Sequence, residues 1–181
     1  MEQEGRVEHA VHSLQFAWSD AGPFRCLVAR SERGLCLSSI GDEGALERLA
    51  RWRDEYAPGA EIVEDACALA SEVSQLDLYF RGERRTLDVE LDLRGTDFQK
   101  QVWLALRTIP FGATRTYGDI ARQIGIPGAM RAVGAANGRN PVPPFVPCHR
   151  VVASNGIGGF TGGLHKKRAL LALESAQVFF A

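Results

Sequence analysis

Residues 116–137 read TYGDIARQIGIPGAMRAVGAAN, and this stretch predicts two short helices joined by a tight turn. Thr116 with Asp119 suggests that a helix begins there. Gly125-Ile126-Pro127 ends that helix, because glycine and proline break helices. A second helix is predicted from Gly128 to Asn137. Helix, tight turn, helix is the arrangement of a DNA-binding helix-turn-helix.

The second predicted helix has unusually small side chains, and Arg131 is its only charged residue. The small residues are Ala129, Ala132, Gly134, Ala135 and Ala136. Two interpretations stay open. Small residues let a helix backbone approach a narrow minor groove, with one arginine projecting alone. They equally allow the helix to pack closely against a neighbouring helix.

A capping box is predicted upstream, where Thr96 is followed by Gln99. Apolar residues then recur at helical spacing from Phe98 to Leu106. Arg94-Gly95 marks the boundary between two domains, which we predict at residues 1–93 and 94–181.

Residues 147–150, PCHR, place a thiol beside an imidazole at a proline-rich turn. Proline fixes φ and donates no hydrogen bond, so the turn can hold a side chain at a set angle. Cys148 becomes a nucleophile if a neighbour removes its proton, and histidine does this best near neutral pH. We expect the sulfur to rest as a thiolate. A buried structural thiol is the alternative, but His149, the helix pair and a glycine-rich loop at 154–163 favour the nucleophile.

A final helix is predicted from Leu164 to Ser175. Lys166, Lys167 and Arg168 lie near its start and Glu174 near its end. These charges oppose the helix dipole at both ends, so packing or function must outweigh it.

In the first half of the chain we find no group of residues typical of a catalytic or binding site, and we predict that it serves as a scaffold. Phe24–Arg30 and Leu35–Ile40 form a predicted hairpin, Glu43–Tyr56 and Ala66–Phe80 are predicted helices, and Leu87–Leu93 alternates as a half-buried strand does. The predicted fold class is α+β, with a small sheet-and-helix domain followed by a mainly α-helical domain.

Charge divides the chain in the same place. Residues 1–93 carry 10 Lys+Arg against 19 Asp+Glu, a net of −9, and residues 94–181 carry 11 against 3, a net of +8. The basic half is therefore the candidate for contact with a polyanion, although uneven surface charge is the alternative. Hydrophobic residues make up 45%, without a run approaching the roughly 20 that span a bilayer, and the first residues lack the features of a signal peptide. We expect a protein of the cytoplasm, associated with the nucleoid when bound to DNA, or of a nucleus.

Four cysteines are present, and without a secretory signal we expect free thiols. Cys26, Cys36 and Cys67 lie in apolar stretches and are predicted to be buried core residues. His9 and His12 with the first two cysteines match no paired-ligand spacing for zinc, so no metal site is predicted.

Several motifs closely resemble those of the O6-alkylguanine-DNA alkyltransferases. They are TDFQKQVW (96–103), RAVG (131–134), Asn140-Pro141, PCHRVV (147–152) and Gly162-Gly163. The resemblance covers nearly all of the basic half and only loosely the hairpin segment from Cys26 to Cys36. It implies a ribonuclease H-like N-terminal domain and a monomer that repairs duplex DNA. The alkyl group of O6-alkylguanine would pass to the protein's own cysteine in one irreversible step without a cofactor, and O4-alkylthymine is an open second substrate.

The same resemblance implies roles in the reaction. Cys148 would be the nucleophile, His149 the base that acts through a water, and Glu174 the carboxylate that orients the histidine, although Glu174 taken alone is more typical of a surface. The remaining groups would stabilise or hold the purine and the turn: Tyr117, the backbone N–H near Thr161, the Val151 carbonyl, Pro143, Phe160 and Asn140.

Other residues would contact the DNA. A base must leave the duplex to reach a buried thiol, and Arg131, with Ala132 beside it, would enter the minor groove and fill the vacated space. Tyr117 would contact the DNA as well as the purine, and the backbone contacts would come from Gln99, Gly118 and Ser154.

Two departures from the family pattern affect the pocket. Phe160 stands where many members have tyrosine, and the loop before it is one residue shorter than usual. Asn137 occupies a groove-facing position that is often apolar. Two other functions compete: a non-catalytic lesion-binding module of the same fold, which would lack the cysteine, and a Cys-His hydrolase or acyltransferase, whose histidine is normally distant in sequence.

Overall fold

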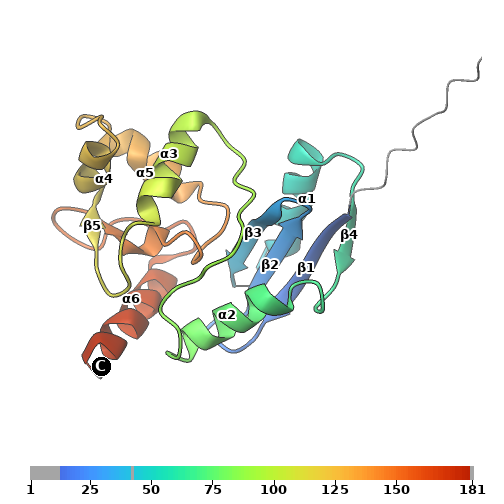
Figure 1. Ribbon diagram of the computed structural model, residues 1–181. Helices are drawn as coiled ribbons and strands as arrows, with labels where there is room; N and C mark the ends of the chain where they lie inside the picture. The colour runs from blue at the N-terminus through green and yellow to red at the C-terminus, as the bar shows by residue number, and fades with distance from the viewer. Residues whose placement is uncertain (1–12, 42, 180–181) are drawn as a thin grey trace, which may run out of the picture.

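The computed structural model describes residues 13–41 and 43–179, with side chains as far as Ser175. The elements are β1 (Ser13–Ser19), β2 (Cys26–Ser31), β3 (Gly34–Ile40), α1 (Ala45–Tyr56), β4 (Glu61–Glu64), α2 (Ala70–Phe80), α3 (Asp97–Leu106), β5 (Arg115–Thr116), α4 (Tyr117–Gln123), α5 (Met130–Gly138), a 3₁₀ turn η1 (Cys148–Arg150), β6 (Val151–Val152) and α6 (Leu164–Phe179). A sheet with its helices forms one part of the molecule and a group of helices forms the other (Figure 1). The predicted α+β class is confirmed.

The N-terminal sheet has the strand order β3-β2-β1-β4, antiparallel except for the parallel pair β1 and β4. The hairpin predicted from the sequence is its β2–β3 pair. Alternate side chains of a strand point to opposite faces, and both faces of β2 are buried. Leu27 joins a core with Leu49 and Trp52 of α1, whereas Val28 joins a core with Leu76 of α2.

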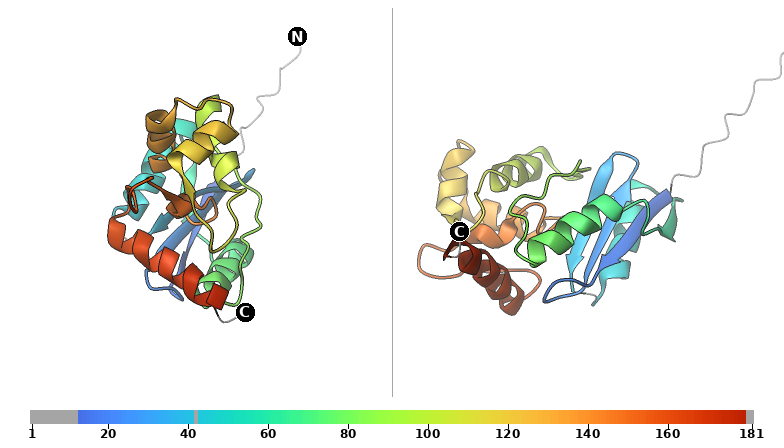
Figure 2. Two further views of the ribbon diagram at one scale, coloured as in Figure 1. Left: turned by 90° about the vertical axis from the view of Figure 1, so that its left-hand side faces the viewer. Right: turned by 60° about the horizontal axis from the view of Figure 1, so that its bottom comes forward.

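The second of these cores continues into the helical part. Besides Val28 and Leu76, it contains Val102 of α3, Val133 of α5 and Leu170 of α6. Figure 2 shows the sheet and the helical part side by side, with α2 across the sheet face turned to the viewer in the right-hand view. The two parts therefore pack through one continuous apolar core.

The helix-turn-helix is confirmed as α4 and α5. The predicted capping box is present at Thr96 with Gln99, and Thr116 with Asp119, expected only as a helix start, forms a second one. The Trp103 Nε1 donates to the Ala136 carbonyl at 2.9 Å and so ties α3 to α5.

Two expectations about the first half are wrong. Residues 87–93 run as an extended connection that pairs with β3 only through Leu91 and Leu35. Leu87, Val89, Leu91 and Leu93 pack against the core, so their alternation reflects burial on one side rather than a neighbouring strand. Cys67 is exposed, because residues 66–69 form a turn before α2 begins.

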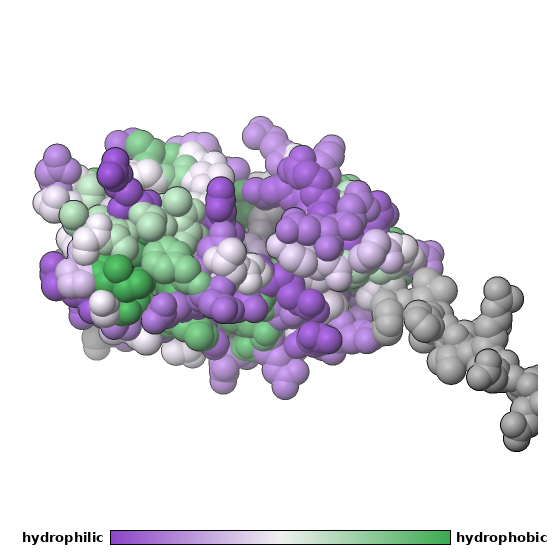
Figure 3. Space-filling view, turned by 90° about the horizontal axis from the view of Figure 1, so that it is seen from above, coloured by the Kyte–Doolittle hydropathy of each residue, from purple (hydrophilic) through white to green (hydrophobic). Residues whose placement is uncertain are grey.

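Hydrophilic side chains gather over the N-terminal part when the molecule is seen from above, and more apolar residues show over the helical part (Figure 3). Within the described ranges, we find no helix with the length and apolar character needed to cross a bilayer.

Candidate active site

Cys148 begins η1, directly after a loop that other residues hold in place. The Asn140 Nδ2 donates to the Val146 carbonyl at 2.7 Å and the Asn140 Oδ1 accepts from Val142 N at 3.1 Å. The N–H of Ser38 in β3 donates to the Pro141 carbonyl at 2.8 Å. Both domains therefore fix the loop that carries the thiol.

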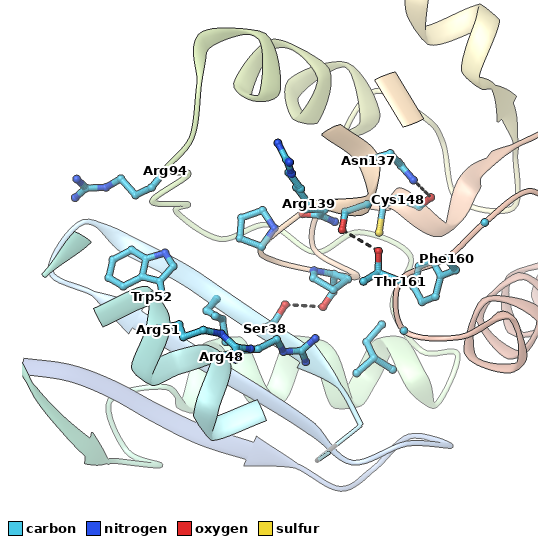
Figure 4. Close-up of a pocket in the computed structure, with 18 of the residues that line it drawn as sticks. Ser38, Arg48, Arg51, Trp52, Arg94, Asn137, Arg139, Cys148, Phe160 and Thr161 are labelled. Carbon is cyan, nitrogen blue, oxygen red and sulfur yellow. Dashed lines mark hydrogen bonds between the residues drawn. The ribbon is translucent and has the colours of Figure 1, made fainter. Parts of the chain in front are cut away.

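The Cys148 side chain faces a cavity of about 570 Å³ (Figure 4). This volume lies in the range of small-molecule sites. Many of the sequence-predicted site residues line it: Tyr117, Asn140, Pro143, Cys148, Phe160 and Thr161. Tyr117, the first residue of α4, lies against Gly134 of α5: a Cβ on Gly134 would be 3.7 Å from its ring, an ordinary van der Waals contact.

His149 and Glu174 form a buried pair behind the cysteine. The His149 Nε2 lies 2.8 Å from the Glu174 Oε1, and both side chains are almost completely buried. Arg150 donates to the same carboxylate through Nε at 3.0 Å and Nη2 at 2.9 Å. Burial opposes the charged form, but the hydrogen bonds and charges of His149 and Arg150 outweigh it and lower the pKa of Glu174 to about 2.

The hydrogen bond to Glu174 determines which ring nitrogen of His149 carries the proton. A carboxylate only accepts, so the His149 Nε2 is the N–H that donates to Glu174. Burial lowers the pKa of His149, so the ring is neutral at pH 7. The Nδ1 then has a lone pair, and it has no hydrogen-bond partner among the described residues. It can accept a proton.

The thiol itself does not rest as the expected thiolate. Burial raises the pKa of Cys148 to about 11, although the Asn140 side chain and the positive charge of Lys167 act in the opposite direction. Desolvation disfavours the ionised sulfur more than these partners favour it. The proton must therefore leave when the sulfur attacks.

Lys167 was not predicted as a site residue. Its side chain is fully buried, and Nζ donates to the carbonyls of Val151 at 2.6 Å and Gly159 at 3.1 Å. The carbonyl expected to accept from the guanine amino group thus already accepts from Lys167. The signal was the unfavourable charge order of the last helix. Lys167 lies in its first turn and is buried in specific hydrogen bonds that outweigh the helix dipole. The helix continues past the predicted end at Ser175 to Phe179, so Glu174 lies inside it and not at its end.

Tyr79 was also missed, since the first half was predicted to lack chemistry. Its hydroxyl donates to the Glu174 Oε1 at 2.7 Å and lies 3.5 Å from the His149 Nε2. Tyr79 belongs to α2, where its spacing resembles that of ordinary core residues, so no local signal distinguished it.

Of the predicted DNA contacts, Tyr117 lines the cavity, and the others do not. Arg131 and Ala132 are exposed on α5, while Val133 and Ala136 face the core, so this helix has both a packed side and an open side. Among the other predicted contacts, Ser154 is exposed, and Gly118 and Gln99 are half-buried. Gln99 accepts from Thr96 N through Oε1 at 2.9 Å, which occupies that oxygen in the helix cap.

Asn137 does not face the groove as expected. It is 4% exposed, and its Nδ2 donates to the Cys148 carbonyl at 3.4 Å. Its side chain lines the cavity, and its amide bonds to the backbone of the reactive turn.

A metal centre has no support in the part of the chain that the structure describes, where no suitable group of His, Cys, Asp and Glu occurs. Cys26 and Cys36 are buried, and burial raises both thiol pKa values to about 12. His9 and His12 lie outside the described residues.

A cysteine that faces a cavity, a histidine–carboxylate pair behind it and a helix-turn-helix above it define a DNA-binding protein with a nucleophilic thiol. Two family models match the chain: the ribonuclease-like domain of 6-O-methylguanine DNA methyltransferase over residues 22–93, and the DNA-binding domain of the same enzyme over residues 97–176. The chain belongs to the 6-O-methylguanine DNA methyltransferase family.

Relatives and solved structures agree with this assignment. A methylated-DNA–protein-cysteine methyltransferase of Mycobacterium tuberculosis is 51% identical over 143 residues, 78% of this chain and 87% of the relative. The inducible enzyme of that name from Bacillus subtilis is 45% identical over 149 residues, 81% of this chain and 82% of the relative. A crystal structure of Mycobacterium tuberculosis OGT in complex with DNA has a TM-score of 0.76 at 44% identity, covering 90% of this chain and 94% of that one.

Proposed function

We propose that this protein repairs DNA by moving the alkyl group of O6-alkylguanine onto the Sγ of Cys148. The observation that carries the proposal is the placement of this thiol: it faces a cavity that could hold a purine, with the buried His149–Glu174 pair behind it. The names of its relatives support the same chemistry. The alternative of a non-catalytic lesion-binding module is disfavoured, because the cysteine is present.

The geometry suggests how the transfer proceeds. The thiol proton passes through a water to the His149 Nδ1 as the sulfur attacks the alkyl carbon, and Glu174 stabilises the imidazolium that forms. The new S–C bond replaces the C–O6 bond, and the guanine leaves with the electron pair. Tyr117 and the backbone N–H near Thr161 would donate to that developing charge.

The product explains the stoichiometry that we propose. A thioether has no good leaving group, so it is not hydrolysed and each molecule reacts once. The step consumes no metal or organic cofactor. Asn140 would keep the turn in place, Pro143 and Phe160 would contact the purine, and the Val151 carbonyl would receive the guanine amino group beside Lys167. O4-alkylthymine is a candidate second substrate.

DNA would bind through the exposed side of α5. The target nucleotide must rotate out of the stack, and Arg131 would enter the minor groove and fill its place, with Ala132 allowing close approach. Gln99, Gly118 and Ser154 would contact backbone phosphates. The net charge of +8 in residues 94–181 supports this assignment.

We also propose that the chain works as a monomer, next to the DNA that it repairs. Its domains would be residues 1–93 and 94–181, in agreement with family-model matches that end at residue 93 and begin at residue 97.

The decisive experiment is incubation with duplex DNA containing O6-methylguanine, followed by mass analysis of the peptides. We expect one added methyl group on the peptide that bears Cys148, and none in Cys148→Ala. An unmodified Cys148 peptide, or equal methylation of the Cys148→Ala chain, would reject the function.

A further inference from the structure

The cavity that contains Cys148 continues to the N-terminal domain, where arginines gather. Arg48 and Arg51 of α1, Arg94 of the connection and Arg139 at the end of α5 all line it. We call these four residues the arginine arm. In Figure 4, Arg48 and Arg51 lie on the side of the N-terminal domain, and Arg139 lies across the cavity, near Cys148.

Three of the four arginines form no ion pair with a carboxylate in the described ranges, although Glu55 also lines the cavity. Arg94 pairs with Asp92, with Nη2 3.0 Å from Oδ2. Arg48 bonds to the Ser39 hydroxyl, and Arg51 and Arg139 form no ion pair with any carboxylate in the described ranges.

Two hydrogen-bond donors at the arm, one in Arg48 and one in the neighbouring Trp52, have no acceptor in the described structure. The Arg48 Nε and the Trp52 Nε1 are buried N–H groups without a hydrogen-bond partner among the residues described, and Trp52 is only 6% exposed. Buried donors are normally paired. Burial, together with the neighbouring charge of Arg51, lowers the pKa of Arg48. An anion in the cavity that only accepts hydrogen bonds would relieve this repulsion and would accept from the exposed Arg51 and Arg139.

Phosphate is the anion that this chemistry fits. Arginine presents its donors as a planar fork that matches phosphate oxygens, and phosphodiesters offer acceptors only. A nucleotide whose base lies beside Cys148 has a phosphate on each side along its strand. The arm opens into the same cavity as Cys148, so the strand that supplies the base also supplies the anion.

We propose that the arginine arm binds a backbone phosphate of the DNA strand whose base enters the Cys148 cavity. This inference rests on the proposed function. It gives the acidic N-terminal domain a direct part in DNA binding, which its net charge of −9 over residues 1–93 conceals.

The test compares arginines on one helix. Arg51→Gln and Arg48→Gln remove charge from the arm, whereas Arg53→Gln is the matched control: Arg53 pairs with Asp54 and does not line the cavity. Each variant is made in a Cys148→Ala background, so that the lesion stays intact, and binding to a duplex with O6-methylguanine is measured over a salt series. Unfolding midpoints verify that the variants are folded.

One lost phosphate contact lowers the slope of log affinity against log salt by about 0.7 to 0.9. We expect that change, with severalfold weaker binding, in Arg51→Gln and Arg48→Gln, and neither change in Arg53→Gln. Equal slopes in all three variants would overturn the proposal. The proposal would also be overturned if inorganic phosphate displaced the DNA while the salt slope stayed the same in all three variants. In that case the arm would bind small anions only. Failure of the unsubstituted chain to accept a methyl group would instead reject the proposed function.

Discussion

Replacing Glu174 by glutamine tests the buried centre of the site. The substitution keeps the size of the side chain and removes its charge. Four groups donate to this carboxylate: His149, Arg150, Tyr79 and the N–H of Gly112, the last at 3.0 Å. The buried Arg150 guanidinium would lose its only carboxylate partner in the described structure.

The structure sets the size of the effect. The pKa of Glu174 is about 2 instead of its ordinary 4.5, and each pH unit corresponds to about 1.4 kcal/mol. The charge therefore stabilises the fold by about 3 kcal/mol, similar to the 3–5 kcal/mol lost when one partner of a buried ion pair is removed. Because the folded-state pKa is lowered, this stabilisation is complete above about pH 4.5 and is lost as the pH falls through about 2.

Denaturant unfolding of the unsubstituted chain and of Glu174→Gln measures this difference directly. At pH 7 the variant should be less stable by about 3 kcal/mol, and the gap should narrow as the pH falls from 4.5 toward 2. Glu61→Gln in the exposed part of β4 is the control and should change little. A Glu174→Gln chain within 1 kcal/mol of the original at pH 7, or a gap that does not depend on pH, would refute the reasoning.

Two further predictions concern the thiol and the glycine loop. Burial keeps Cys148 protonated and lowers the pKa of His149. As the pH is raised, the transfer rate should therefore increase while His149 loses its proton, below the ordinary histidine pKa, and then stay level through neutral pH. A His149→Ala chain should instead gain rate steadily toward about pH 11, and equal profiles would exclude the histidine as base. Gly158→Ala should slow transfer at least tenfold and destabilise the fold by roughly 1–3 kcal/mol, since φ is +71° and a Cβ there would lie 3.1 Å from the Tyr117 hydroxyl. Gly156→Ala is the control: a Cβ there would meet nothing within 4 Å, and Gly156 does not line the cavity, so this variant should react normally. Kinetics and unfolding are measured in parallel for both variants, and an equal loss in both would contradict the argument.

Local patterns predicted local structure well. Each capping box joins residues three apart, such as Thr96 and Gln99, so its outcome depends little on the rest of the fold. The hairpin of β2 and β3 is similarly local. Leu87–Leu93 was mispredicted because alternation shows which side chains are buried, whereas a strand also needs a neighbour along its whole length.

By itself, the sequence determined the pieces of the site: a thiol and an imidazole joined at Cys148 and His149, and a helix pair beside a basic half. Only the tertiary structure decided how they act together. Glu174 lies 25 residues beyond His149, and Tyr79 lies 70 residues before it, yet both contact the same ring. The resting thiol and the arginine arm likewise depend on the enclosing fold, because desolvation and charge interactions are set by distances in space and not by separation along the chain.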